Sequence, residues 1–273
     1  MKLNRAVGIV TGASRGIGVV IAEQLARKGV DLALAARSED ALQATKEKVE
    51  RFGVRVVAIP TDVTKRDDLR TLVKRTTAEL GPPDILINNA GIERVVEFNQ
   101  MDPADIDALI KTNVSALLML TRFVVPGMIE RRRGHIVNIA SLAGKTAAPY
   151  QTVYSATKHA VVGFSWSLRE ELRQHRIGVS AVCPGYVSEA GMFVDRGPEE
   201  PPKISSTVTP KKVGEATIKA IEKNRAEIIV APGAAKVVDV LHAISPELTT
   251  KIARGAGAYA YIARAARREP KGE

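Results

Sequence analysis

Tyr154 and Lys158 are four residues apart in the stretch YSATK, ahead of a helical run through Phe164, Trp166 and Leu168. Residues with this spacing stand on the same face of a helix, one turn apart. A phenol beside an ammonium can act as a proton donor, because the positive charge lowers the phenol pKa from about 10 toward neutral pH. The spacing also arises by chance on solvated helix faces, so the rest of the chain must decide between these two interpretations.

A glycine-rich turn precedes the first predicted helix. In TGASRGIG, residues 11–18, Gly12, Gly16 and Gly18 follow an apolar run and lead into a helix expected from about Ile17. Glycines permit a tight turn and let the backbone approach a pyrophosphate, whose charge the helix N-terminus favours. We therefore predict a nucleotide-binding turn here rather than a purely structural one.

The second apolar run ends in Ala35, Ala36 and Arg37. Dinucleotide sites that prefer NAD usually place an acidic residue here, where it binds the ribose hydroxyls. Ala36 lacks a carboxylate, whereas Arg37 and Arg15 can hold a 2′-phosphate. This pattern favours NADP(H) over NAD(H), although an arginine in a loop is otherwise simply a solvated charge.

Apolar runs alternate with helical patterns along most of the chain. The helical patterns cover residues 19–28, 39–52 and 106–129. The strand candidates are nearly continuous in apolar residues, which is typical of parallel strands covered on both faces. We predict an α/β fold, a Rossmann-like doubly wound parallel sheet of about seven strands with helices on both faces. The candidate strands are AVGIVTG, DLALAAR, VRVVAIPTDV, DILINNAG, GHIVNIAS, GVSAVCPG and AEIIVAPG.

The chain is expected to hold one catalytic domain, residues 1–235, and a basic helical C-terminal extension, residues 236–273. Residues 186–210 carry many Pro, Gly and Ser residues and no sustained period, as in a functional lid or a disordered loop. Residues 251–268 of this extension (KIARGAGAYAYIARAARR) have three interpretations: a helix docked on its own domain, a helix packed on a neighbouring subunit, or a basic amphipathic helix on an anionic membrane. The first is favoured, because Gly255 and Gly257 weaken an autonomous helix.

Polar or glycine-rich residues follow several of the predicted strands. Asp62 and Val63 follow the third strand, residues 88–91 (NNAG) the fourth, and Ser141 the fifth. Ligands of open α/β sheets bind outside the carboxyl ends of the strands. Each residue alone is compatible with a capping role, as for Asp62 ahead of the helix near Lys65. Their common placement favours a binding site.

This ordered set of motifs resembles the short-chain dehydrogenase/reductase family, over residues 5 to about 235. The resemblance rests on TGASRGIG, the DV pair at 62–63, NNAG at 88–91, KTNVSA, NIAS, YSATK and the PG pair at 184–185. It implies an NADPH-dependent reductase of a ketone or aldehyde, reversible as an alcohol oxidation. Tyr154 would be the general acid/base, and Lys158 would hold the nicotinamide ribose and favour the phenolate. Ser141 would bind the substrate carbonyl, and Asn113 would hold a water that relays protons to Lys158.

The same resemblance implies the residues that contact the cofactor. One position departs from the family pattern: after the PG pair, Glu189 stands where a threonine is common, so either Ser188 takes its place or the loop is seated differently. The predicted cofactor-binding residues are Gly12, Ser14, Arg15, Gly16, Ile17, Gly18, Arg37, Asp62, Val63, Asn89, Ala90, Gly91, Tyr154, Lys158, Pro184, Gly185 and Val187.

The lid segment includes Met192, Phe193 and Val194, which suit a hydrophobic carbonyl substrate or simply pack the lid onto the body. A homodimer or homotetramer is the family default. The alternative function, from a different class, is a nucleotide-binding regulator or scaffold without significant turnover. The set of Asn113, Ser141, Tyr154 and Lys158 argues against it, since a pure binder does not need all four.

Composition narrows the remaining possibilities. Because Cys183 is the only cysteine, an internal disulfide framework is excluded. We expect Cys183 to be a small buried hydrophobic residue rather than a nucleophile. The net charge of +10 fits an anionic cofactor, and the few aromatic residues are not interleaved with basic ones, so we expect no nucleic-acid partner. The four histidines lack metal-ligand spacing. With no leader-like segment and no stretch of about 20 uninterrupted apolar residues, we expect a cytoplasmic protein.

Overall fold

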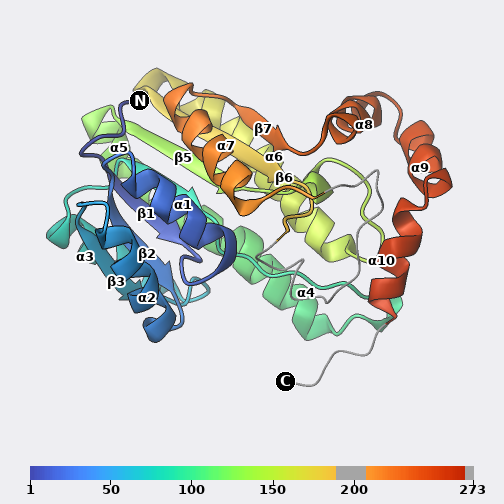
Figure 1. Ribbon diagram of the computed structural model, residues 1–273, viewed down its shortest axis with the longest axis horizontal. Helices are drawn as coiled ribbons and strands as arrows, with labels where there is room; N and C mark the ends of the chain where they lie inside the picture. Colours follow the sequence, from blue (N-terminus) through green and yellow to red (C-terminus); the bar gives the residue numbers. More distant parts are fainter. Residues whose placement is uncertain (189–206, 268–273) are drawn as a thin grey trace.

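The computed structural model describes residues 1–188 and 207–267. Its centre is a seven-stranded sheet, and the neighbouring strands pair in parallel in the order β3-β2-β1-β4-β5-β6-β7. The doubly wound parallel sheet predicted from the sequence is therefore confirmed (Figure 1). The strands are β1 Val7–Thr11, β2 Asp31–Ala36, β3 Val56–Pro60, β4 Ile85–Asn88, β5 Gly134–Ile139, β6 Ile177–Pro184 and β7 Glu227–Val230.

The strands are buried because helices cover the sheet on both faces. On one face, α1 (Gly16–Ala26), α2 (Glu39–Glu50) and α7 (Pro210–Glu222) contribute to one apolar core. A second core on the opposite face holds residues of the other three long helices. These are α3 (Arg66–Glu79), α5 (Ala116–Arg131) and α6 (Thr152–Leu172). The strand order changes direction between β1 and β4: β2 and β3 lie on one side of β1, and β4 to β7 lie on the other. The carboxyl ends of β1 and β4 therefore flank the crevice where such sheets bind ligands.

The single helix predicted over residues 106–129 is longer and interrupted. Helix α4 (Pro103–Ile110) leads through a π-helical turn, Lys111–Ser115, into α5. The continuous run Pro103–Arg131 is long and apolar enough to cross a membrane, by length and composition alone, which a count of uninterrupted apolar residues did not indicate. Because residues of α5 pack into the core between the sheet and α3, we assign it as a core helix.

Three short helices follow the last strand and form the C-terminal extension. They are α8 (Gly233–Ile244), α9 (Pro246–Gly255) and α10 (Ala258–Ala266). The extension lies at the carboxyl ends of the strands, because Lys145, after β5, contacts Asp239 of α8, and Glu97, after β4, contacts Arg267 (Figure 1). The boundary placed at residue 235 stays a prediction.

Most of the predicted lid, residues 189–206, lies outside the described residues, including Glu189, Met192, Phe193 and Val194. The two flanks of this segment meet in a parallel bridge between Val187 and Val208. Thr209 then caps α7, whose first residue is Pro210.

Candidate active site

The turn between β1 and α1 requires glycine. Gly12 has a φ of +64°, and a Cβ there would lie 2.9 Å from Asn89 Nδ2 and 3.0 Å from Ala90 Cα. A side chain at Gly18 would collide with the Gly12 carbonyl. The close packing brings the β1 turn against the NNAG segment and leaves the N-terminus of α1, which no side chain caps, beside this turn. Such an arrangement suits the pyrophosphate of a dinucleotide.

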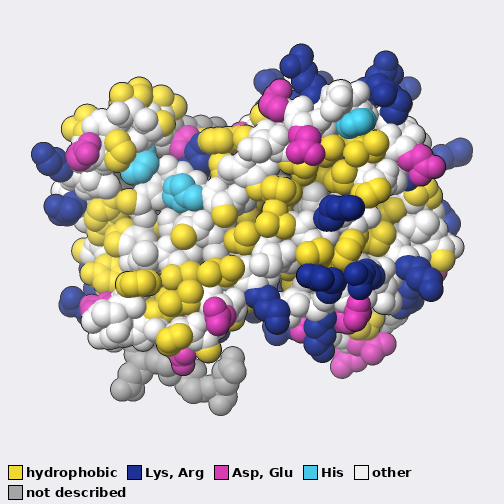
Figure 2. Space-filling model, turned by 180° about the vertical axis from the view of Figure 1, so that it is seen from behind, with side chains coloured by type: hydrophobic (Ala, Val, Ile, Leu, Met, Phe, Trp, Pro, Cys, Tyr) yellow, Lys and Arg dark blue, Asp and Glu magenta, His cyan; other side chains and the backbone are white. Residues whose placement is uncertain are grey.

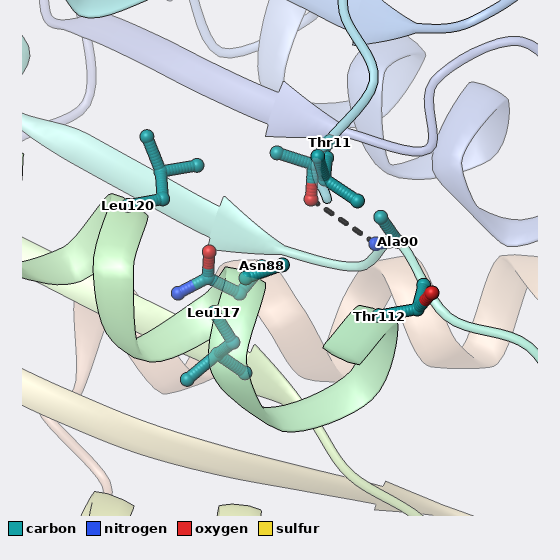
Figure 3. Close-up of a pocket in the computed structure, with 8 residues that line it drawn as sticks. Thr11, Asn88, Ala90, Thr112, Leu117 and Leu120 are labelled. Carbon is teal, nitrogen blue, oxygen red and sulfur yellow. Dashed lines mark hydrogen bonds between the residues drawn. The ribbon is translucent and has the colours of Figure 1, made fainter. Parts of the chain in front are cut away.

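Thr11 joins the carboxyl ends of β1 and β4. Its hydroxyl accepts a hydrogen bond from the backbone N–H of Ala90 at 3.1 Å (Figure 3) and another from the backbone N–H of Asn89 at 3.0 Å. The Asn89 side chain in turn donates to the Thr11 carbonyl at 2.9 Å. The sequence analysis missed Thr11, although its place just before Gly12 is a usable signal.

A small pocket opens where these strand ends meet the π-helical turn and α5. Figure 3 shows Thr11 and Ala90 on the strand side and Leu117 and Leu120 on the helix side. The pocket brings the predicted cofactor residues Val63 and Ala90 together. Its lining comprises Thr11, Val63, Asn88, Ala90, Thr112, Ala116, Leu117 and Leu120.

Asp62 shapes its own loop and does not cap α3, whose N-cap is Lys65. Its carboxylate accepts hydrogen bonds from the backbone N–H of Thr64, at 2.9 Å, and from the Thr64 hydroxyl, at 2.7 Å. Burial alone would raise the Asp62 pKa, but the bonds from Thr64 and the charges of Lys65 and Arg37 outweigh it, so the pKa is lowered. Asp62 is therefore an ionised acceptor at neutral pH.

The end of β2 offers positive charge and no carboxylate. Ala36 is buried at the strand end, and Arg37 directly after it is exposed. Arg15, in the turn before α1, is also exposed and makes contacts of its own. Ser14 and Ile17 are half-buried in that turn, and Ile17 packs against the core beneath it.

Tyr154 and Lys158 occupy the first two turns of α6 and are both buried, with 6% and 4% of their surface exposed. The Lys158 ammonium lies 5.6 Å from the centre of the Tyr154 ring and donates to the Ile139 carbonyl at 2.9 Å. Burial lowers the Lys158 pKa to about 8, against the opposing negative charge of Glu93. A desolvated ammonium beside a phenol can stabilise the phenolate.

Ser141 follows β5 and begins a 3-10 turn, Leu142–Gly144. Its hydroxyl oxygen accepts from the Ala143 N–H at 3.1 Å, while the Ser155 hydroxyl donates to the Ala143 carbonyl at 2.6 Å. A Cβ at Gly144 would lie 2.6 Å from the backbone carbonyl carbon and oxygen of Lys158. The Ser141 turn is thus held directly against the helix that carries Tyr154 and Lys158.

Asn113 lies in the π-helical turn, 2% exposed. It bonds to the backbone of Ile92 and donates to the Thr157 hydroxyl at 3.1 Å. A Cβ at Gly91 would lie 3.2 Å from Asn113 Oδ1 and 3.7 Å from Lys158 Nζ. The structure therefore brings Gly91, Asn113 and Lys158 together.

Glu93 and Gln151 belong to this site, and the sequence analysis did not select them. The Gln151 amide donates to the Glu93 carboxylate across the loop after β4 and the start of α6. Gln151 is buried, and the charge of Glu93 acts on Lys158. Their only sequence signal is proximity: Glu93 is two residues after NNAG, and Gln151 is three residues before Tyr154.

The segment after β6 returns to the same edge of the sheet. The Gly185 N–H donates to the Val230 carbonyl at 3.0 Å, directly after Pro184 ends the strand. The Ser188 hydroxyl donates to the Val208 carbonyl at 3.3 Å, beside the bridge made by Val187. Glu189, which stands where a threonine is common in the family, lies outside the described residues. Cys183 is buried in β6, and burial raises its pKa to about 12, as expected of an inert thiol.

Comparison with known proteins identifies a consistent group of relatives. A family model described as short chain dehydrogenase matches residues 6–201. The ketoacyl reductase HetN of Nostoc sp. is 42% identical over 81% of this chain and 77% of that protein. A variant of actinorhodin polyketide ketoreductase, solved with NADPH, is 31% identical with a TM-score of 0.78 over 84% of this chain and 97% of its own. A metagenomic short-chain oxidoreductase in complex with NADP is 32% identical with a TM-score of 0.72, covering 85% and 99%.

Proposed function

The chain belongs to the short-chain dehydrogenase/reductase family, and from that premise we propose that it uses NADPH to reduce a ketone or aldehyde, with an acyl ketone as the first candidate. Its relatives establish the coarser statement, an oxidoreductase that acts on carbonyl groups of small molecules with a nicotinamide cofactor. The acyl ketone is suggested by the names of two relatives, a ketoacyl reductase and a polyketide ketoreductase.

The burial of Lys158 beside Tyr154 is the observation that carries the proposed mechanism. When bound, the nicotinamide supplies the hydride that is added to the carbonyl carbon. The Tyr154 hydroxyl gives its proton to the carbonyl oxygen, and the Lys158 ammonium stabilises the phenolate that remains. Ser141 donates a hydrogen bond to the same oxygen and so supports the developing negative charge. Alcohol oxidation runs through the same groups in reverse.

The preference for NADPH rests on the end of β2. Ala36 offers no carboxylate to bind ribose hydroxyls or to repel a 2′-phosphate, and the exposed guanidinium of Arg37 follows it. Structures of two relatives contain NADPH or NADP, which agrees with the proposal.

Replacement of the tyrosine tests the mechanism. We expect Tyr154→Phe to lower kcat by about a hundredfold or more, the usual contribution of a positioned general acid. NADPH binding, followed by fluorescence, should stay close to wild type. Tyr150→Phe is the matched control, four residues earlier, and should reduce kcat far less. Wild-type turnover in Tyr154→Phe would contradict the assignment.

A homodimer or homotetramer stays a prediction, which light scattering of the purified protein can check.

A further inference from the structure

Helices α8 and α9 expose a row of aliphatic side chains. Among the described residues, most of the well-exposed large hydrophobic side chains belong to these two helices. Figure 2 shows hydrophobic side chains gathered over the end of the molecule that carries α8 and α9, with Lys and Arg side chains at its edge. The row, which we call the aliphatic face, consists of Val237 (59% exposed), Val240 (61%), Ile244 (78%), Leu248 (49%) and Ile252 (45%).

On α8, the aliphatic face lies on the side away from the contact that anchors this helix. Val237, Val240 and Ile244 have the spacing of one helix face. Asp239 lies on the other side of α8, where it is 8% exposed and 3.9 Å from the Lys145 ammonium. Lys145 also contacts Glu227 of β7 at 3.2 Å, so α8 is held to the body by its polar side. The apolar side of α8, with Val237, Val240 and Ile244, is therefore exposed on the surface.

A hydrogen-bonded corner joins α8 to α9. The Nδ1 atom of His242 lies 2.7 Å from the Thr249 hydroxyl, which is also 3.0 Å from the Pro246 carbonyl. The Ser245 side chain accepts from the Leu248 N–H and caps α9. Thr249 is buried at this corner, whereas Leu248 beside it is exposed. The two helices therefore present the aliphatic face from a fixed framework.

Besides the aliphatic face, the extension carries exposed basic side chains. Lys251 and Arg254 on α9 and Arg264 on α10 are exposed. In the part of the chain that the structure describes, none of the three forms an ion pair. Residues 233–267 hold five Lys and Arg residues against Asp239 and Glu247; of these, Asp239 is engaged by Lys145 and Arg267 by Glu97. The surroundings that complement this surface are apolar and negatively charged.

We propose that the aliphatic face of α8 and α9 binds the surface of an anionic lipid bilayer. A helix side that combines exposed aliphatic residues with Lys and Arg can bury the former at the headgroup boundary while the latter meet anionic headgroups. A second copy of this chain fits less well, because a symmetric contact would bring the same basic residues face to face. The sequence analysis favoured a helix docked on its own domain for residues 251–268, because Gly255 and Gly257 weaken an autonomous helix.

The test is co-sedimentation of the full-length protein with phosphatidylcholine vesicles that contain or lack phosphatidylglycerol. We expect binding to the anionic vesicles, weakened by salt, and little binding to pure phosphatidylcholine. Ile244→Asp should reduce binding about tenfold or more, because it places a charge in the buried part of the contact. Phe98→Asp, a substitution at an apolar residue outside the extension that is 60% exposed against 78% for Ile244, is the matched control and should bind as wild type.

The basic residues are tested with a second matched pair. Lys251→Glu should weaken binding to anionic vesicles about fivefold or more, whereas Lys74→Glu, on an exposed site of α3, should not. Absence of wild-type binding, or equal losses in Ile244→Asp and Phe98→Asp, would overturn the proposal. So would a wild-type oligomer that dissociates in Ile244→Asp without vesicles, because the face would then belong to a second copy. Carbonyl reductase activity in solution is measured separately and does not decide this question.

Discussion

The amide of Asn113 binds the backbone of Ile92 in both directions. Its Oδ1 accepts from the Ile92 N–H at 2.8 Å, and its Nδ2 donates to the Ile92 carbonyl at 2.9 Å. This pair holds the loop after β4 beside the π-helical turn, so Gly91 and Glu93, on either side of Ile92, are fixed relative to Lys158. This contact is compatible with the proton-relay role predicted for Asn113. It also gives Asn113 a structural role, because it holds the loop after β4 in place.

Replacement of Asn113 should cost both stability and rate. Asn113→Leu leaves the Ile92 N–H and carbonyl without their partner, which costs about 1–3 kcal/mol for each group that stays unpaired and buried. We expect a lower free energy of unfolding in urea and a lower kcat. Asn113→Asp keeps the acceptor for the Ile92 N–H, but its carboxylate can donate to the Ile92 carbonyl only when protonated, so its loss of stability relative to Asn113→Leu should shrink on acidification. A difference between the two variants that does not change with pH would mean that the Ile92 contact is not what matters.

Glu93 should set the alkaline limit of activity through Lys158. Burial lowers the Lys158 pKa to about 8, and the charge of Glu93 opposes that shift. In Glu93→Gln the opposing charge is gone, so the pKa falls further and Lys158 loses its proton at lower pH. We expect the rate to fall at lower pH than in wild type, with little change in acid solution where Lys158 stays protonated. The measurement is kcat against pH.

Glu97→Gln is the control for this pH profile. Glu97 lies four residues further along, and its contact is Arg267, at 3.8 Å, rather than Lys158. Its profile should follow that of wild type. A Glu93→Gln profile that kept the wild-type alkaline limit would show that the carboxylate does not act on Lys158.

The fold was predictable because each strand corresponds to one local apolar run in the sequence. The run DLALAAR forms β2, which pairs in parallel with β3, and GHIVNIAS forms β5, which pairs in parallel with β6. The motif residues at the carboxyl ends of such strands meet at one edge of the sheet. The π-helical turn was not predictable, because one extra residue per turn barely alters an apolar pattern. Its consequence, the contact between Asn113 and Ile92, depends on that turn.

Contacts between distant segments account for most of what the sequence analysis missed at the site. Gln151 and Glu93 are 58 residues apart, and no periodicity relates them. The Tyr154–Lys158 pair, by contrast, was found because four residues always form one turn of a helix. The roles assigned to both pairs stay predictions until the variants are measured.

His135 should make the protein less stable as the pH falls. It is buried in β5 beside the Ser180 hydroxyl, at 2.8 Å, and burial lowers its pKa from 6.5 to about 3. Above pH 6.5 the ring is neutral in both states. Below it, the unfolded chain binds a proton that the native ring takes up only near pH 3, so stability falls over that window by at most about 1.4 kcal/mol per pH unit.

Urea unfolding of His135→Gln across the same pH window tests this. The variant should start less stable, because the fit to Ser180 is disturbed, but should lose less stability on acidification. His175→Gln, in the 3-10 turn after α6, should keep the wild-type dependence on pH. An unchanged slope in His135→Gln would assign the acid sensitivity to other groups.

The end of β2 should decide between the two dinucleotides. Arg37→Ala removes the charge proposed to hold the 2′-phosphate, so KM for NADPH should rise about tenfold while KM for NADH changes little. Arg51→Ala, at the far end of α2, is the control and should change neither value. Equal effects on both cofactors would place Arg37 elsewhere, against a part of the dinucleotide that NADH and NADPH share.

The contact between Gly144 and Lys158 should tolerate no side chain. In Gly144→Ala the new Cβ would lie 2.6 Å from the backbone carbonyl of Lys158, so the Ser141 turn and α6 must move apart. We expect a loss of about 1–3 kcal/mol in the free energy of unfolding, together with a lower kcat as the Ser141 turn shifts relative to α6. Gly163→Ala is the matched control on α6 itself, because nothing lies within 4 Å of its Cβ position. That variant should gain up to about 1 kcal/mol from higher helix propensity and keep its activity. Similar behaviour of the two alanine variants would show that the turn and the helix are not in such close contact.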